Sequence, residues 1–313
     1  MALPKFLFLF LFLFPFLAPP SAHAAERLLV LLSGDSWAYT RVEQALVRSL
    51  NPQVRNSLRV TVATVGDTDG APQPDDSLVV AVGVRAAAQA LQSSRPTPVL
   101  CVLVPQITFD MLRRVYTGDS GRPVSAIYLD QPMGRQLDLV RLTVPTLQQV
   151  GVLLGPNSRM ARKTLESAAH ARGISVHIGE IGPDDNPIAA LTSVLDDSDA
   201  LLAEPDPVVF NRGNLEGILL STYRMSIPVI GFSHAYVQAG ALAAVYSTPE
   251  QIGRQAGELI SRMARLGRWQ LPKPSYPAYY TVTVNRQVAR SLRLDVPTGQ
   301  QLQAELEKLE RRQ

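Results

Sequence analysis

The chain has 313 residues, with 30 Lys and Arg against 27 Asp and Glu, and a formal net charge of +3. This near balance, without basic clusters that carry interleaved aromatics, makes nucleic acid a poor candidate partner. The length is too great for one ordinary core and suits two lobes. Cys101 is the one cysteine, so no internal disulfide can form. Its place in "PVLCVLV" predicts a buried, inert thiol.

Residues 1–24 have the pattern of a secretory signal. Lys5 gives a positive start, residues 6–17 form an apolar run, and "AHA" at 22–24 is a small-x-small cleavage site. No cysteine follows the run, so we expect a cleaved leader, no lipid anchor and a periplasmic product that begins near Ala25. An uncleaved membrane anchor is the alternative, but the run is short for a bilayer. No later segment stays apolar for the ~18 residues that a span needs.

From Arg27 onward, short apolar runs alternate with helical patterns, which is typical of βαβ units with parallel sheets buried on both faces. The predicted strands are 28–32, 58–64, 78–82, 99–104, 126–129, 150–154, 175–178, 200–203, 229–231, 242–246 and 280–284. The clearest predicted helix spans 249–266, where apolar residues recur at three- and four-residue steps. Two near-equal sets of strands predict two doubly wound lobes, with a break near Pro145. The tail from Gln300 is predicted to form a solvated surface helix.

Residues 31–40, "LLSGDSWAYT", resemble the opening of GDSL esterases, in which Gly-Asp-Ser presents a nucleophile. Such an enzyme needs a general base and oxyanion donors, which that family supplies in a Gly-x-Asn-Asp block and a late Asp-x-x-His block. Neither block occurs here. A triad assembled from distant residues stays open as an alternative. We predict that Ser36 is not a nucleophile and that the chain is not an enzyme.

Polar and aromatic residues follow successive predicted strands, at the positions where open α/β sheets bind ligands. Ser36 suits a helix N-cap or a ligand contact, and Trp37 can cover an apolar or ring-bearing ligand. Arg85 suits a ligand carboxylate, and "LLAEPDPVV" offers Glu204 and Asp206, of which Asp206 suits an ammonium group. Turn and cap roles are the alternative at each position taken singly. The candidates from the strand ends are Gly34, Asp35, Ser36, Trp37, Gly83, Val84, Arg85, Gln106, Asp130, Asn157, Ser158 and Asp206.

We predict neither a metal site nor a cofactor. His170, His177 and His234 have no partner at helical spacing, and the cysteine is isolated. No Gly-x-x-x-x-Gly-Lys-Ser/Thr loop occurs, and no Gly-x-Gly-x-x-Gly turn follows the first strand. The sequence therefore contains no recognisable nucleotide-binding device.

The run 199–267, from "DALLAEPDPVVF" through "IPVIGF" and "AGALAAV" to "IGRQAGELISRM", resembles the substrate-binding proteins of ABC transporters. The similarity is to the group that includes tryptophan- and tyrosine-binding members. Upstream, "VVAVGVRAAAQAL" and "QQVGVLLGPNSR" resemble the other cleft segments of that family, and "VNRQVARSLRLDVP" resembles its closing segment. The resemblance covers nearly the whole chain after the signal.

This resemblance implies a type I periplasmic-binding-protein fold, with two α/β parallel-sheet lobes joined by a hinge and a small ligand in the cleft. It implies chain crossings near residues 130, 247 and 276. The N-terminal lobe would then be 25–129 and 247–275, the C-terminal lobe 130–246 and 276–297, and the helical tail 298–313.

The resemblance also assigns ligand positions. The residues that match them are Asn157, Ser158, Asp206, Phe232 and Ser233. One departure is Gly83-Val84-Arg85-Ala86, where the family commonly has Gly-Thr-Pro-Ala, so a hydroxyl that would bind a ligand carboxylate is missing.

We therefore expect a non-catalytic, monomeric periplasmic receptor. It would close on a small solute, such as an amino acid or an aromatic acid, and deliver it to an ABC permease in the membrane. A periplasmic sensory module that presents its liganded state to a membrane signalling receptor is the alternative, and the esterase is a third.

Overall fold

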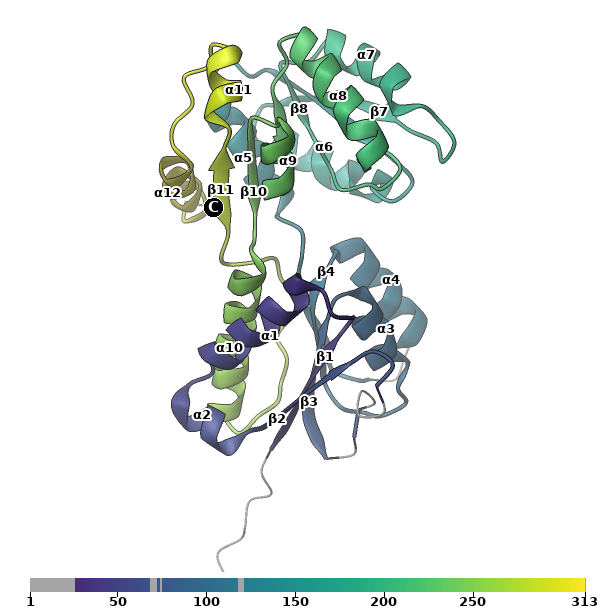
Figure 1. The fold of residues 1–313 in the computed structure, drawn as a ribbon, viewed down its shortest axis with the longest axis vertical. Coiled ribbons are helices and arrows are strands. Elements are labelled where there is room, and N and C mark those ends of the chain that lie inside the picture. Colours follow the sequence, from purple (N-terminus) through teal and green to yellow (C-terminus); the bar gives the residue numbers. More distant parts are fainter. Residues whose placement is uncertain (1–25, 68–71, 74, 118–120, 313) are drawn as a thin grey trace, which may run out of the picture.

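The computed structural model describes residues 26–67, 72–73, 75–117 and 121–312. It consists of two lobes, each a sheet with helices on both faces (Figure 1). The expected signal segment, residues 1–24, lies outside the described residues. Within the described ranges, no helix combines the length and the apolarity that crossing a membrane requires.

The N-lobe, lower in Figure 1, contains a parallel sheet in the order β2-β1-β3-β4-β5. Its strands are β1 (Arg27–Leu32), β2 (Arg59–Thr64), β3 (Asp76–Val82), β4 (Val99–Val104) and β5 (Val124–Tyr128). Its helices are α1 (Trp37–Ser49), α2 (Pro52–Ser57), α3 (Val84–Gln92), α4 (Gln106–Tyr116) and α10 (Pro249–Arg265). Helices α1, α2 and α10 pack on one face of the sheet, and α3 and α4 on the other. Because both faces are covered, the strands are continuous apolar runs.

Helix α10 belongs to the N-lobe although it comes late in the chain, and it lies along α1 (Figure 1). Gly253 and Gly257 make this close approach possible. A Cβ on Gly253 would lie 2.3 Å from the backbone O of Val42, and one on Gly257 would lie 2.4 Å from the backbone O of Leu46. Thr248 starts the helix in a capping box, which fixes the point where the chain turns into the N-lobe.

The C-lobe contains a sheet in the order β11-β10-β9-β8-β6-β7. Its strands are β6 (Gln149–Leu154), β7 (Ser175–Glu180), β8 (Ala200–Leu202), β9 (Val229–Gly231), β10 (Ala243–Tyr246) and β11 (Thr281–Val284). Its helices are α5 (Met133–Thr143), η2 (Arg159–Ala161), α6 (Arg162–His170), α7 (Pro187–Asp196), α8 (Arg212–Arg224), α9 (His234–Ala239), α11 (Arg286–Ser291) and α12 (Gly299–Glu310). All its strand pairs are parallel except β10 with β11.

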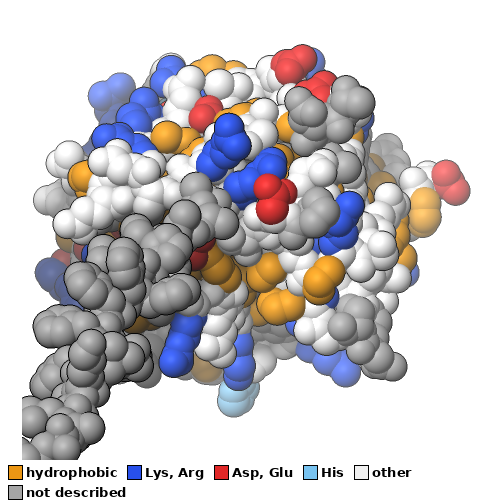
Figure 2. All heavy atoms as spheres, turned by 90° about the horizontal axis from the view of Figure 1, so that it is seen from below, with side chains coloured by type: hydrophobic (Ala, Val, Ile, Leu, Met, Phe, Trp, Pro, Cys, Tyr) orange, Lys and Arg blue, Asp and Glu red, His pale blue; other side chains and the backbone are white. Residues whose placement is uncertain are grey.

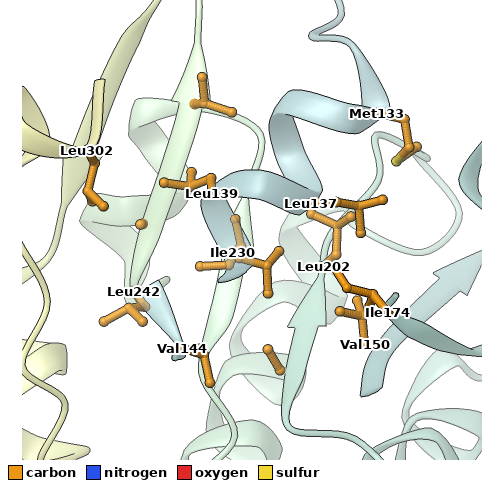
Figure 3. Packing of buried hydrophobic residues seen from close by; sticks show 14 of the residues in the cluster. Met133, Leu137, Leu139, Val144, Val150, Ile174, Leu202, Ile230, Leu242 and Leu302 are labelled. Atoms are coloured by element: carbon orange, nitrogen blue, oxygen red, sulfur yellow. The ribbon is translucent and has the colours of Figure 1, made fainter. Parts of the chain in front are cut away.

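Figure 3 shows the core on one face of this sheet, where α5 and α12 pack over the strands. Leu302 and Leu306 of α12 are 0% and 1% exposed. The expectation of a solvated surface helix is therefore wrong for this side of the helix. The leucine spacing places these side chains on one side of α12, but it does not reveal that this side meets a core already formed by residues such as Leu137 and Leu242.

The chain passes between the lobes at residues 129–132, 247–248 and 276–280. Before the third crossing, Ser275 still pairs with the N-lobe, donating its N–H to Ala126 O at 2.9 Å. A break near Pro145, as strand counting suggests, is wrong because α5 precedes that proline and already packs in the C-lobe core.

Hydrogen bonds tie these three crossings together. Gln131 donates to Ser247 Oγ at 2.9 Å, and Ser247 donates to the backbone O of Tyr279 at 2.6 Å. The buried guanidinium of Arg135 donates to Gln131 Oε1 at 2.6 Å and to the backbone O of Pro277 at 3.1 Å. The crossings therefore form one connected group and not three independent linkers.

The predicted fold class is confirmed, with two doubly wound lobes built mostly of parallel strands. Each predicted strand is present, with its ends shifted by at most a couple of residues. Among the described elements, the substantial helix and strand packing stays within one lobe or the other. The lobes are thus joined chiefly through the crossings, which is the arrangement that a hinge requires.

Candidate functional site

The two sheets point their carboxyl ends at each other. Strand β5 runs directly into the first crossing and so ends toward the C-lobe, and β1, β3 and β4 run parallel to it. Strand β10 runs into the second crossing and ends toward the N-lobe, and β9, β8 and β6 run parallel to it. The turns after these strands therefore lie on the facing edges of the two lobes, where open α/β sheets bind ligands.

All the predicted site residues lie in these turns or in the first helical turn that follows them. Gly34, Asp35, Ser36 and Trp37 follow β1; Gly83, Val84 and Arg85 follow β3; Gln106 follows β4; Asp130 follows β5. Asn157 and Ser158 follow β6, Asp206 follows β8, and Phe232 and Ser233 follow β9. The structure thus brings the predicted set to two facing edges, and contact with a ligand stays a prediction.

The turn after β3 is held by a residue that sequence reasoning missed. Ser33, directly after β1, donates its hydroxyl to Val82 O at 2.7 Å and accepts from the backbone N–H of Ala86 at 2.9 Å. It thereby caps the start of α3 from a neighbouring strand. Gly83 has φ of 87°, and a Cβ there would lie 2.6 Å from Ser33 Oγ, so this position requires glycine. The exposed Arg85 donates to the backbone O of Ser33 at 3.1 Å.

In the turn after β1, Ser36 and Trp37 are placed where a ligand could contact them. Ser36 occupies the N-cap position of α1, but its hydroxyl makes no capping hydrogen bond. Trp37 is 63% exposed, with the Arg41 guanidinium 5.5 Å from its ring centroid. Tyr39 completes the first turn and packs against the N-lobe core. The Ser36 side chain therefore does not cap α1.

Among the described residues, no histidine lies near Ser36 to act as the base that the esterase alternative needs. Within the described part of the chain, His170, His177 and His234 all belong to C-lobe elements, whereas Ser36 lies in the N-lobe. A nucleophilic serine needs a base within hydrogen-bond reach. The arrangement gives no support to a triad at this position.

Exposed apolar side chains gather at the same edge of the N-lobe. Trp37, Val84, Ile107 and Leu129 are all exposed, and each stands within the turn or first helical turn after a different strand. Adjacent strands in the sheet order carry them. Large exposed hydrophobic groups at one edge are typical of an interaction site. Figure 2 looks onto the opposite end of the N-lobe, where basic, acidic and hydrophobic side chains are interspersed.

Gln106 and Asp130 contact each other beside the first crossing. The Gln106 backbone N–H, at the start of α4, donates to Asp130 Oδ2 at 2.5 Å. Tyr276, on the third crossing, donates its hydroxyl to Gln106 Oε1 at 2.5 Å. Burial raises the pKa of the Asp130 carboxyl, and the hydrogen bond from Gln106 acts in the opposite direction. This carboxylate lies where α4 and two crossings meet.

Asp206 has its carboxylate occupied by its own lobe. Its Oδ2 accepts from the backbone N–H groups of Asn157 and Ser158 at 2.8 and 2.9 Å, and from the Ser158 hydroxyl at 3.0 Å. Its Oδ1 accepts from the backbone N–H of Val208 at 2.9 Å. Four donors leave this buried group little capacity for an ammonium ion, which is the role that the sequence suggested. Asp206 instead joins the turns after β6 and β8.

The turn after β9 is aromatic. Phe232 lies with its ring centroid 4.2 Å from that of Tyr236, and Phe210 packs edge-on near both. Ser233 stands at the N-cap of α9 without a side-chain capping bond. This half of the site therefore supplies a ring surface and a hydroxyl.

Glu204, two residues before Asp206, differs from it sharply. It is 7% exposed, and its Oε1 has no hydrogen-bond partner among the described residues. Burial first, and the charge of Asp130 second, raise the pKa of Glu204 to about 8, while a hydrogen bond with Gln136 opposes them. Sequence reasoning noted Glu204 in "LLAEPDPVV" but gave the ammonium role to Asp206. Nothing in the local sequence shows that the two carboxylates have different environments.

Cys101 lies fully buried in β4, and burial raises the pKa of its thiol to about 12. The prediction of a buried cysteine is confirmed, and its lack of reactivity stays a prediction. Among the described residues, no three His, Cys, Asp or Glu side chains come together in a way that could hold a metal ion.

Comparison with known proteins identifies the family. Residues 71–297 match the family model described as "ABC transporter substrate binding protein". The chain belongs to this family. The resemblance seen in the sequence is thereby confirmed at the level of the family. Comparison with curated proteins gives no sequence match.

Solved structures similar to this substrate-binding protein share its fold at low identity. A ligand-free, open substrate-binding protein with adhesive properties from Clostridium difficile is 16% identical, covering 87% of this chain and 96% of that chain, with a TM-score of 0.71. A conserved domain protein from Vibrio cholerae is 18% identical, covering 90% and 98%, with a TM-score of 0.59. A domain from Streptococcus pneumoniae in complex with L-Trp is 16% identical, covering 88% and 96%, also at 0.59. The substrate-binding protein thus has the predicted type I periplasmic-binding-protein fold.

Proposed function

We propose that this protein is a non-catalytic periplasmic receptor that closes its two lobes on a small solute and delivers the solute to an ABC permease. The observation that carries the proposal is that polar and aromatic turns of both sheets lie on the facing edges of lobes joined by three crossings. Membership of the substrate-binding family supports it. The exposed Trp37 and the partly buried ring of Phe232, which packs on the core residue Tyr236, favour a solute with an apolar or ring-bearing part.

The first test measures solute binding directly. The chain from Ala25 is screened by thermal shift against amino acids, amines, aromatic acids and sugars, and calorimetry gives the affinity of each solute that shifts the transition. A solute that binds the folded state raises the transition temperature by mass action. If no solute in the panel produces a thermal shift or heat of binding, the proposal fails.

A pair of variants locates the site. Trp37→Ala should weaken binding by roughly tenfold, because it removes a large ring from the N-lobe edge. Tyr223→Ala is the matched control, since Tyr223 is also exposed, at 54%, but lies at the far end of α8. Equal affinities of the two variants would place the ligand elsewhere.

Closure and delivery need separate measurements. Small-angle scattering should show a smaller radius of gyration once the ligand is bound, because a ligand that prefers the closed form shifts the population toward it. An unchanged radius with proven binding would remove the hinge mechanism. Stimulation of ATP hydrolysis by the partner transporter in liposomes tests delivery, and binding to a signalling receptor in place of a permease would replace transport by sensing.

A further inference from the structure

Glu204 is a buried carboxylic acid at the edge of the C-lobe that faces the N-lobe. It closely follows β8, and its Oε1 is enclosed without a donor from the described residues. The side chain of Gln136, on α5, bonds to the carboxylate. A carboxylate oxygen that has lost water and gained no donor destabilises the fold. A buried polar group that lowers stability in this way indicates a role in function.

A second carboxylate acts on Glu204 from the first crossing. The negative charge of Asp130 disfavours ionisation of Glu204, in addition to the effect of burial. Tyr276, on the third crossing, interacts electrostatically with both carboxyl groups. No cationic side chain is among the groups that act on Glu204 or on Asp130. Two acids therefore share a partly desolvated region between the lobes without a positive charge to balance them.

We propose that Glu204 and Asp130 bind the positively charged nitrogen of the solute, which is therefore a cationic or zwitterionic amine with an apolar body. An ammonium group supplies charge and several N–H donors, and charge-assisted hydrogen bonds to carboxylates are the stronger kind. The exposed side chains of Trp37, Val84 and Leu129 at the N-lobe edge suit the apolar body.

Glu204 lies near the segments that join the two lobes. Asp130 and Tyr276, which interact electrostatically with Glu204, lie on two of the crossings, so a movement of one lobe against the other changes their positions relative to Glu204. The inference thus rests on the proposed function, because the solute reaches the pair during closure. Asp206 is not part of this subsite, since its Oδ2 accepts from the turn after β6 and its Oδ1 accepts from Val208.

The experiment uses solutes that share a body and differ in charge. Tryptamine, tryptophol and indole-3-propionate form one set, phenethylamine, 2-phenylethanol and 3-phenylpropionate a second, and the corresponding L-amino acids are added to each. Calorimetry is carried out with the native protein, Glu204→Gln and Asp130→Asn. Glu216→Gln is the control, because Glu216 is an exposed glutamate on α8 of the same lobe. Circular dichroism and gel filtration first establish that each variant is folded.

The expected result is binding of the cationic or zwitterionic members only. Glu204→Gln and Asp130→Asn should each weaken it by about tenfold to a hundredfold, and Glu216→Gln by less than about twofold. Binding of the alcohols or acids with equal affinity in the native protein and Glu204→Gln would overturn the inference while leaving the proposed function intact. No binding by any solute of the sets or of the broader panel would overturn both.

A proton count adds a readout that a merely structural role would not change. Because burial raises the pKa of Glu204 to about 8, a cation that binds its ionised form should release protons near neutral pH. The titratable groups that face Glu204 are Asp130 and Tyr276, with the neutral Gln136 on the third side. The heat of amine binding should then vary with the ionisation enthalpy of the buffer in the native protein and not in Glu204→Gln. A heat that is independent of the buffer in both proteins contradicts the assignment.

The last measurement compares the thermal shifts produced by sodium and potassium salts at equal ionic strength. An inorganic cation could use the same pair of carboxylates. A thermal shift produced by one of these ions alone, lost in Glu204→Gln and matching that of the amines, would overturn the assignment to a solute nitrogen.

Discussion

Replacing Glu204 by glutamine should make the C-lobe less sensitive to pH. The pKa of Glu204 is raised from 4.5 to about 8, so the folded protein keeps a proton that the unfolded chain releases. Stability is then greatest below the unfolded pKa and falls as pH rises toward the folded pKa. Each pH unit in this window costs about 1.4 kcal/mol for one proton, so the loss between pH 5 and pH 7 is roughly 2–3 kcal/mol. Glutamine cannot ionise and should escape this loss.

The assay is urea unfolding of the native protein and Glu204→Gln at pH 5 and pH 7, followed by circular dichroism. Other titrating groups contribute equally to both proteins, so the difference between the two pH dependences isolates Glu204. Glu216→Gln, at an exposed position, should follow the native curve. Parallel pH dependences for the native protein and Glu204→Gln would refute the view that this carboxyl is buried and protonated in the fold.

Three further substitutions test the architecture of the site and its supports. Asp206→Asn should destabilise the C-lobe by about 1–3 kcal/mol in denaturant melts, because the amide cannot replace all the bonds that the carboxylate accepts; unchanged stability would show that these bonds do not hold the turn. Gly83→Ala should lower stability by about 1–3 kcal/mol, because alanine is strained at positive φ and its Cβ would meet Ser33. An unchanged melting temperature would contradict that geometry. Leu302→Ala should cost about 2–5 kcal/mol as a buried core substitution, whereas a loss below about 0.5 kcal/mol would be the signature of a solvated helix.

The strands and the turns that follow them could be predicted from the sequence. In β1, β3 and β4 nearly every residue is buried, because helices cover both faces of the sheet, so each strand is a continuous apolar run. The parallel arrangement then places the residues after each strand at one edge. For that reason the predicted site residues, from Gly34 to Ser233, could be located without coordinates.

The position of the late helices was decided by tertiary structure. The pattern of α10 shows an apolar side but not the lobe that it covers, and its attachment to α1 depends on Gly253 and Gly257 meeting the backbone at Val42 and Leu46. Helix α12 is a similar case, since its leucines meet a core assembled from distant segments.

The sequence by itself determined that two carboxylates, Glu204 and Asp206, follow one strand at the edge of a sheet. Only the tertiary structure decided how they differ. Asp206 meets the backbone N–H groups of the turn at Asn157 and Ser158, 49 and 48 residues earlier in the chain. Glu204 instead experiences the charge of another acid, Asp130, which lies on a crossing between the lobes. Whether a carboxylate is satisfied or left free depends on which donors the fold brings to it, and local sequence carries no record of those distant neighbours.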